Sequence, residues 1–146
     1  MDKFIIQGGI PLKGEVTPSG NKNAALPLLA ACILTREPVI LHNIPDIKDV
    51  QAMLDLLKSM GVEVTFLGDH SWKIQAREIC CSSLDPELCS QIRASILIAG
   101  PVIARTGQLE LPPPGGDVIG RRRLDTHILA LQALGVKTSY NKARKL

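Results

Sequence analysis

Aromatic side chains are scarce in this chain, which has one Trp, one Tyr and two Phe among its 146 residues. Proteins that bind single-stranded nucleic acid stack bases on aromatic rings, and this platform is largely missing here. The net charge of +3 is also well short of the dense basic surface that binds a phosphate backbone. We therefore expect no nucleic-acid partner, and local clusters of charge matter more than the total.

Long apolar runs are also lacking. The longest, AALPLLAACIL, is too short to cross a bilayer and contains a proline, so we expect no membrane partner. The opening MDKFIIQGG has neither the charged start nor the apolar run of a secretory signal, which favours a cytoplasmic location.

The cysteines lack the pattern of a metal site. No second CxxC pair or suitably spaced histidine joins Cys80, Cys81 and Cys89 in a tetrahedral set, so no metal ion is expected. We interpret these thiols and that of Cys32 as small buried apolar groups.

The apolar residues that are present, 45% of the chain, follow the periods of strands and helices in the first half. FIIQGGIPLKGEVTPSG predicts one or two short strands. Nearly every position from Ala24 to Leu34 is apolar, which predicts a helix buried on all sides and capped by an asparagine among residues 21–23. PVILHNI predicts a strand.

A second helix and a hairpin follow. Apolar residues at three- and four-residue spacing predict a helix that is capped by Asp46 or Asp49 and ended by Gly61. VEVTFLGDHSWKIQA alternates on both sides of Gly68-Asp69, which predicts a hairpin.

The pattern restarts after Asp85-Pro86 with a helix, ELCSQIRASILIAGPVIA, a strand, GQLEL, and a helix, LDTHILALQALGV. LLKSMGVEVT matches LQALGVKTSY, with Gly61 and Gly135 lying 74 positions apart. The chain thus reads as two copies of a unit of roughly 70 residues in an α/β (α+β) fold. The second copy lacks its closing hairpin, so we expect an incomplete domain.

The stretch SGNKNAAL is a candidate anion site. Lys22 lies where the buried helix is expected to begin, so its ammonium, the free backbone N–H groups and the positive end of the helix dipole would converge. The alternative is a surface lysine beside a capped helix.

The loop PPPGGDVIGRRRLDTH is the second candidate. Its prolines stiffen the base and Gly115-Gly116 frees the tip, as in a lid, while Arg121, Arg122 and Arg123 offer planar donors for phosphate or carboxylate. The alternatives are a solvated basic turn and, for Asp117, a turn residue bonded to its own backbone.

Four ordered motifs, SGNKNAALPLLAA, the arginine of QIRAS, PPGGDVIGRRRLDTHI and the closing LGV, resemble the bacterial UDP-N-acetylglucosamine enolpyruvyl transferases of the EPSP synthase superfamily. The resemblance runs from residue 1 to about residue 140. It implies a cofactor-free transfer of the enolpyruvyl group from phosphoenolpyruvate to the 3′-hydroxyl of UDP-N-acetylglucosamine, the first committed step of peptidoglycan synthesis.

The resemblance also implies an inside-out α/β barrel of repeated βαβαββ units with buried helices, incomplete in this chain. Residues 1–19 would be a strand segment of a second domain, and residues 20–146 part of the first domain, in two repeats, 20–84 and 85–146. The second domain completes the site in the family, so the isolated chain is expected to be inactive or nearly so.

Residue by residue, the resemblance implies that Lys22 and Asn23 contact phosphoenolpyruvate. It assigns to the nucleotide sugar Arg93, Arg122, Arg123, Leu124, Asp125 and Thr126. Family members more often have Ala-Arg-Pro where this chain has Arg121-Arg122-Arg123, and most place a cysteine at the position of Asp117. That residue is the general acid that helps protonate the methylene carbon of phosphoenolpyruvate.

Physical chemistry sets a condition on Asp117. An unperturbed aspartic acid, with a pKa of about 3.9, is protonated about once in a thousand molecules at pH 7. Arg121–Arg123 would lower its pKa further, so desolvation and the negative charge of bound substrate must raise it. Two other functions stay open at this point: a shikimate-type enolpyruvyl transferase and a non-catalytic module that binds nucleotides or RNA.

Overall fold

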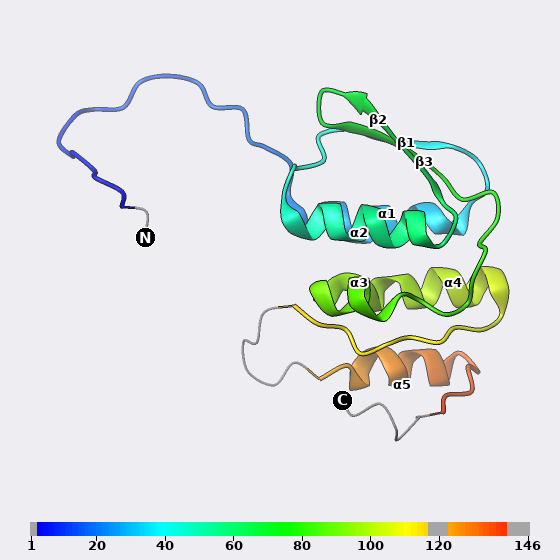
Figure 1. Cartoon of the computed structure of the whole chain (residues 1–146). Helices are drawn as coiled ribbons and strands as arrows, with labels where there is room; N and C mark the ends of the chain where they lie inside the picture. Colours follow the sequence, from blue (N-terminus) through cyan, green and yellow to red (C-terminus); the bar gives the residue numbers. More distant parts are fainter. Residues whose placement is uncertain (1–2, 117–122, 140–146) are drawn as a thin grey trace.

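The computed structural model describes residues 3–116 and 123–139 (Figure 1). It has an α+β fold with one small antiparallel sheet of strand order β1-β3-β2. The elements in chain order are α1 (Lys22–Ala31), the 3-10 helix η1 (Cys32–Leu34), β1 (Val39–Leu41), α2 (Lys48–Ser59), β2 (Glu63–Gly68), β3 (Ser71–Gln75), α3 (Pro86–Gln91), the 3-10 helix η2 (Arg93–Ile98), α4 (Ala99–Thr106) and α5 (Asp125–Ala133).

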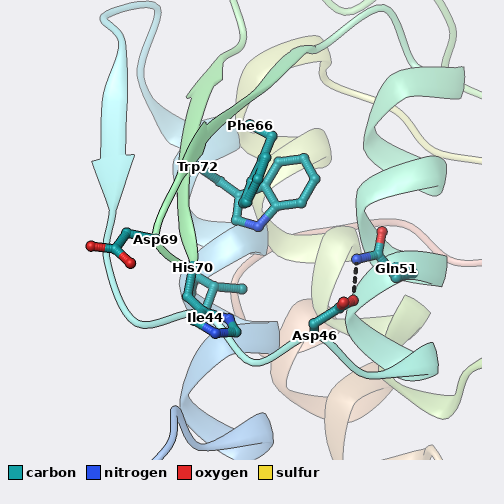
Figure 2. Close-up of a pocket in the computed structure, with 7 residues that line it drawn as sticks. All are labelled: Ile44, Asp46, Gln51, Phe66, Asp69, His70 and Trp72. Atoms are coloured by element: carbon teal, nitrogen blue, oxygen red, sulfur yellow. Dashed lines mark hydrogen bonds between the residues drawn. The ribbon is translucent and has the colours of Figure 1, made fainter.

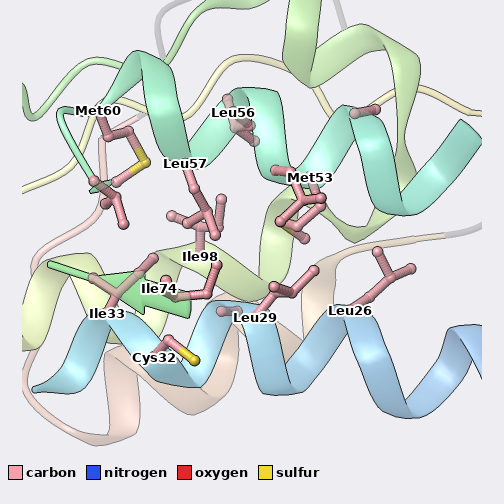
Figure 3. Packing of buried hydrophobic residues seen from close by; sticks show 14 of the residues in the cluster. Leu26, Leu29, Cys32, Ile33, Met53, Leu56, Leu57, Met60, Ile74 and Ile98 are labelled. Atoms are coloured by element: carbon pink, nitrogen blue, oxygen red, sulfur yellow. The ribbon is translucent and has the colours of Figure 1, made fainter. Parts of the chain in front are cut away.

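These elements lie in layers (Figure 1). The sheet lies over α1 and α2, α3 and α4 form the next layer, and the segment that follows α4 runs between that layer and α5. The core fills the space between α1 and α2 and extends to Ile74 of β3 and Ile98 of η2 (Figure 3). One continuous apolar cluster therefore joins both predicted units, and burying it is the main favourable term in folding.

The predicted hairpin is confirmed. Its turn is formed by Asp69 and His70, one position later than the predicted Gly68-Asp69, and these two residues have φ angles of 49° and 53°. Two central residues with positive φ match the right-handed twist of the paired strands. The predicted strand in PVILHNI is also confirmed, because β1 pairs with β3 through Val39 and Ile74.

Helix α1 confirms the predicted cap but not the predicted burial. The side chain of Asn21 accepts hydrogen bonds from the amides of Asn23 and Ala24 and caps the helix. Leu29 is fully buried, whereas the adjacent Leu28 is 48% exposed. The prediction that the helix is buried on all sides is therefore wrong for this chain, because within the described residues α2 and η2 cover one face alone.

Helix α2 has the predicted apolar face but a different start. Its N-cap is Ile47, which has no side chain that can cap, so the expectation of Asp46 or Asp49 at the cap is wrong. Asp49 lies instead in the first turn, where the positive end of the helix dipole stabilises its negative charge. Its buried positions are Val50, Ala52, Met53, Leu54, Leu56 and Leu57.

The ends of α2 and α5 share one geometry, as their sequence match suggests. The amide of Val62 donates to the carbonyl of Leu57 at 3.1 Å, and the amide of Val136 donates to the carbonyl of Leu131 at 3.0 Å. Gly61 and Gly135, which precede the two valines, have φ angles of 85° and 91°. Both helices thus end in the left-handed turn that glycine adopts without strain.

Two regions are less regular than the sequence predicts. The helix expected after Asp85-Pro86 is divided into α3, η2 and α4, and buried Ile92, which has extended backbone angles of φ −135° and ψ 137°, separates α3 from η2. The strand expected at GQLEL is reduced to one bridge between Ser83 and Glu110. No strand forms in residues 3–19, which are exposed and extend away from the core, since a strand needs a neighbour for its backbone hydrogen bonds (Figure 1).

Arg105, in the last turn of α4, links the two predicted units. Its Nη1 donates to the carbonyl oxygens of Ile33 at 2.6 Å and Thr35 at 3.2 Å, and its Nη2 donates to those of Ala76 and Arg77 at 3.1 Å each. The planar guanidinium reaches two separate segments at once, which a point-like ammonium cannot do.

Within the described residues, no helix is long and apolar enough to cross a membrane.

We predict that Arg105→Lys lowers the free energy of unfolding by about 2 kcal/mol, because carbonyl groups at the end of η1 and beyond β3 lose a charged donor. Chemical denaturation measures the change. The control is Arg36→Lys at an exposed arginine, which is expected to change stability by less than about 0.5 kcal/mol. Equal stability of the two variants would contradict the prediction.

The interpretation of the cysteines as buried apolar groups is correct for two of them. Cys32 and Cys89 are buried, Cys81 is half-buried and Cys80 is exposed. Burial raises the pKa of the Cys89 thiol to about 11, although a hydrogen bond with Ser95 opposes the rise. Burial also raises the pKa of Cys32.

Alkylation at pH 8 is therefore expected to modify Cys80 and Cys81 and to spare Cys32 and Cys89, whose thiolates are rare and enclosed. Mass spectrometry of peptides from iodoacetamide-treated protein gives the pattern. In guanidinium chloride all four thiols should react at similar rates. Rapid labelling of Cys89 in the folded protein would be inconsistent with its burial.

Candidate functional site

Lys22 and Asn23 lie in the first turn of α1, where the sequence predicts an anion site. Lys22 Nζ is 2.8 Å from Asp49 Oδ2, and the two side chains are 48% and 43% exposed. The oxygen of Asn21 already accepts from the amides of Asn23 and Ala24. The two amides thus have an internal partner. The ammonium of Lys22 also has a partner, but its side chain is half exposed and stays accessible to an anion.

Helices α1 and α5, which carry predicted site residues, begin at the same end of the molecule as α2. Figure 1 shows α1, α2 and α5 with their N-termini on the side where the N-terminal segment enters. The contact between Lys22 and Asp49 joins the first turns of α1 and α2 directly. Positive helix ends gathered on one side favour anions there.

The base of the proline-rich loop is held against α3 by its backbone. The amide of Gly115 donates to the carbonyl of Cys89 at 3.0 Å, and the amide of Gly116 donates to that of Ser90 at 3.1 Å. A Cβ on Gly116 would lie 3.0 Å from the backbone nitrogen of Arg93. The structure therefore brings Arg93 to the base of the loop. The tip residues Asp117, Arg121 and Arg122 lie outside the described residues.

The C-terminal side of the loop contains an internal ion pair. Arg123 Nε is 2.5 Å from Asp125 Oδ2, with side chains 79% and 49% exposed. Asp125 is in the first turn of α5, Leu124 is the residue that precedes this helix, and Thr126 is exposed. The Arg123 side chain is thus paired, and its exposure leaves it accessible to another anion.

The structure also contains a cavity that none of the predicted site residues lines. It has a volume of about 400 Å³ and is lined by Ile44, Asp46, Gln51, Phe66, Asp69, His70 and Trp72 (Figure 2). The rings of Phe66 and Trp72 have centroids 4.9 Å apart, and Gln51 Nε2 donates to Asp46 Oδ1 at 2.8 Å. Its two carboxylates make it unsuited to an anionic substrate.

Sequence reasoning missed the partnership of Asp49 with Lys22 and the role of Arg105. Asp49 was predicted only as a possible helix cap, and nothing in the local pattern indicates a partner 27 positions away. For Arg105 the one local signal is a basic residue in the last turn of a helix, where it complements exposed carbonyl groups.

A solved structure shares this fold. The enolpyruvyl transferase NikO from Streptomyces tendae aligns with a TM-score of 0.60 and 26% sequence identity, covering 68% of this chain and 23% of that chain. The family model for EPSP synthase (3-phosphoshikimate 1-carboxyvinyltransferase) matches residues 6–146. The chain belongs to the EPSP synthase family.

Within that family the chain is similar to the N-terminal portion of particular enzymes. The UDP-N-acetylglucosamine 1-carboxyvinyltransferases of Bradyrhizobium diazoefficiens and Treponema denticola are each 53% identical over 137 residues, which are 94% of this chain and 32% of each relative. That of Bacteroides fragilis is 41% identical and matches 100% of this chain. The resemblance stated from the motifs is confirmed. The chain spans about a third of the length of the curated relatives it matches.

The packing at Gly115 leads to a stability prediction. A Cβ at this position would overlap the carbonyl oxygen of Ser90, so Gly115→Ala must displace the loop base and is expected to cost about 1–3 kcal/mol. Gly100→Ala in α4 is the control, since nothing lies within 4 Å of its Cβ. This variant should be neutral or stabilised by up to about 1 kcal/mol. Urea denaturation measures the free energy of unfolding of both variants. Equal stabilities of the two variants would contradict the packing argument.

Proposed function

We propose that the protein that contains this chain transfers the enolpyruvyl group of phosphoenolpyruvate to the 3′-hydroxyl of UDP-N-acetylglucosamine, with release of phosphate. The observation that carries the proposal is the 53% identity with two UDP-N-acetylglucosamine 1-carboxyvinyltransferases across 94% of the chain. In that role the reaction is the first committed step of peptidoglycan synthesis.

Lys22 is proposed to bind phosphoenolpyruvate, with Asn23 beside it. The pair with Asp49 does not prevent this role, because an exposed salt bridge contributes only about 0–1 kcal/mol. A substrate that carries both a phosphate and a carboxylate offers the ammonium a stronger partner. Binding therefore replaces a weak internal contact with a charge-assisted one.

Arg93 and the loop are proposed to form the nucleotide-sugar side of the site. The support is the backbone contact of Gly115 and Gly116 with the end of α3, which fixes the loop base beside Arg93. From this base the loop carries Asp117 and Arg122, and its far side ends in Arg123, Leu124, Asp125 and Thr126. Arginines on both sides of a substrate can orient its phosphates bidentately.

Asp117 is proposed as the general acid that supplies a proton to the methylene carbon while the sugar hydroxyl attacks the neighbouring carbon. Loss of phosphate then leaves the enolpyruvyl ether. Because nearby arginines favour the ionised carboxylate, Asp117 must gain its proton in the closed site, where desolvation and substrate charge raise its pKa. Its role rests on its place at the family's cysteine position.

The proposed architecture is the family's inside-out barrel of βαβαββ repeats, with residues 20–84 and 85–146 as two repeats of one domain. Residues 1–19 are proposed to be a strand segment of a second domain. Two features support this arrangement: residues 3–19 are exposed with large apolar side chains, and α1 exposes an apolar face. In this arrangement further chain covers both surfaces and completes the site.

A second acceptor has one observation in its favour. The family model that matches residues 6–146 is named for 3-phosphoshikimate 1-carboxyvinyltransferase. Shikimate 3-phosphate is therefore the alternative acceptor, and the proposal predicts that it does not support turnover.

The test is phosphate release by the full-length protein with phosphoenolpyruvate and each acceptor. UDP-N-acetylglucosamine should support turnover, and Lys22→Met should reduce kcat/KM by about a hundredfold or more, because a charged contact to the reacting group is lost. The control is Lys58→Met, whose lysine pairs with Asp55 at 3.0 Å in a similarly exposed ion pair. The 146-residue chain alone should show almost no turnover, since in the proposed arrangement a second domain completes the site.

Turnover with shikimate 3-phosphate and none with UDP-N-acetylglucosamine would show that the acceptor is shikimate 3-phosphate instead. No turnover with either acceptor would overturn it, as would normal activity of Lys22→Met.

A further inference from the structure

We propose that Asp49 is a positioning residue for Lys22, which holds the lysine ammonium in place until the phosphate or carboxylate of phosphoenolpyruvate replaces it. This inference rests on the proposed function. Its basis is the contact of 2.8 Å between Lys22 Nζ and Asp49 Oδ2, which joins the first turns of two different helices.

Asp49 is well suited to hold another group still. Its side chain is short and projects from the first turn of α2, where the helix dipole favours a negative charge. The helix itself is fixed by the fully buried side chains of Val50, Met53, Leu54 and Leu57. The carboxylate therefore occupies a nearly fixed point relative to the core.

Lys22 needs such a partner because its own helix does not restrain it. The lysine stem has four rotatable carbons and an exposed side chain, so without a partner its ammonium samples many positions. The cap of α1 is formed by Asn21, whose oxygen binds backbone amides and leaves the ammonium untouched. Among the described contacts, the one that fixes the ammonium is that with Asp49.

The strength of the pair fits a role in orientation rather than in stability. Both side chains are nearly half exposed, so the contact is weak and is exchanged readily for a more strongly charged anion. Because the ammonium is already placed at the start of α1, binding the substrate costs less side-chain entropy. A pair that is weak but ordered lowers the cost of binding without competing strongly.

A second ion pair in the same helix provides the contrast. Lys58 and Asp55 are 3.0 Å apart with similar exposure, but they lie three positions apart on α2 and connect no other element. This local pair can place no group relative to α1. It therefore serves as a matched control for the loss of an exposed aspartate partner.

The experiment is a double-mutant cycle in the full-length enzyme with phosphoenolpyruvate as the varied substrate. Asp49→Asn is expected to raise KM for phosphoenolpyruvate about fivefold, which corresponds to one side chain that must be ordered on binding, with kcat changed less than twofold. Asp49→Glu, which keeps the carboxylate, should recover most of the loss. In a Lys22→Met background, Asp49→Asn should have no further effect, because its action passes through the lysine.

Asp55→Asn should leave both kinetic constants unchanged, and thermal melts should show that all four single variants are folded. A lower KM in Asp49→Asn would show that the carboxylate merely competes with substrate and would overturn the inference. An unchanged KM, or an effect that persists in Lys22→Met, would also overturn it. Absence of turnover in the wild-type enzyme would instead remove the proposed function, and this inference with it.

Discussion

The guanidinium of Arg105 connects the two halves of this chain. Carbonyl groups at the end of η1 and after β3 belong to the first predicted unit, while α4, which carries the arginine, belongs to the second. Carbonyls at the ends of helices and strands lack partners of their own, and a planar cation with several donors can satisfy two sets together. The apolar cluster packs the same units, but it is non-directional, whereas the arginine fixes how they meet.

The candidate site lies at the end of the molecule where α1, α2 and α5 begin (Figure 1). The cations there are balanced by nearby acids: Lys22 contacts Asp49, and Arg123 contacts Asp125. Such exposed pairs are weak, so the charged groups stay available to a multiply charged anion. A basic site with internal carboxylate partners is therefore compatible with a modest net charge for the whole chain.

Local signals were predicted well from the sequence. Asn21 caps α1, Gly61 ends α2 and the hairpin forms with its turn one position later than predicted, because each of these features depends on a few neighbouring residues. The errors have tertiary causes. Ile47 starts α2 in place of an aspartate, and Ile92, whose side chain is buried and whose backbone is extended, interrupts the expected long helix. The full burial predicted for α1 depends on which elements pack against it, and composition alone cannot supply them.

The sequence by itself determined the family, the hairpin, the asparagine cap of α1 and the glycine that ends α2. These properties are carried by residue types and short spacings, which are visible in one dimension. The tertiary structure alone decided that Lys22 meets Asp49, that Arg93 lies at the base of the glycine loop, and that Arg105 joins the units. Each of these contacts joins residues more than twenty positions apart, and such pairs are set by packing of whole elements rather than by local preference.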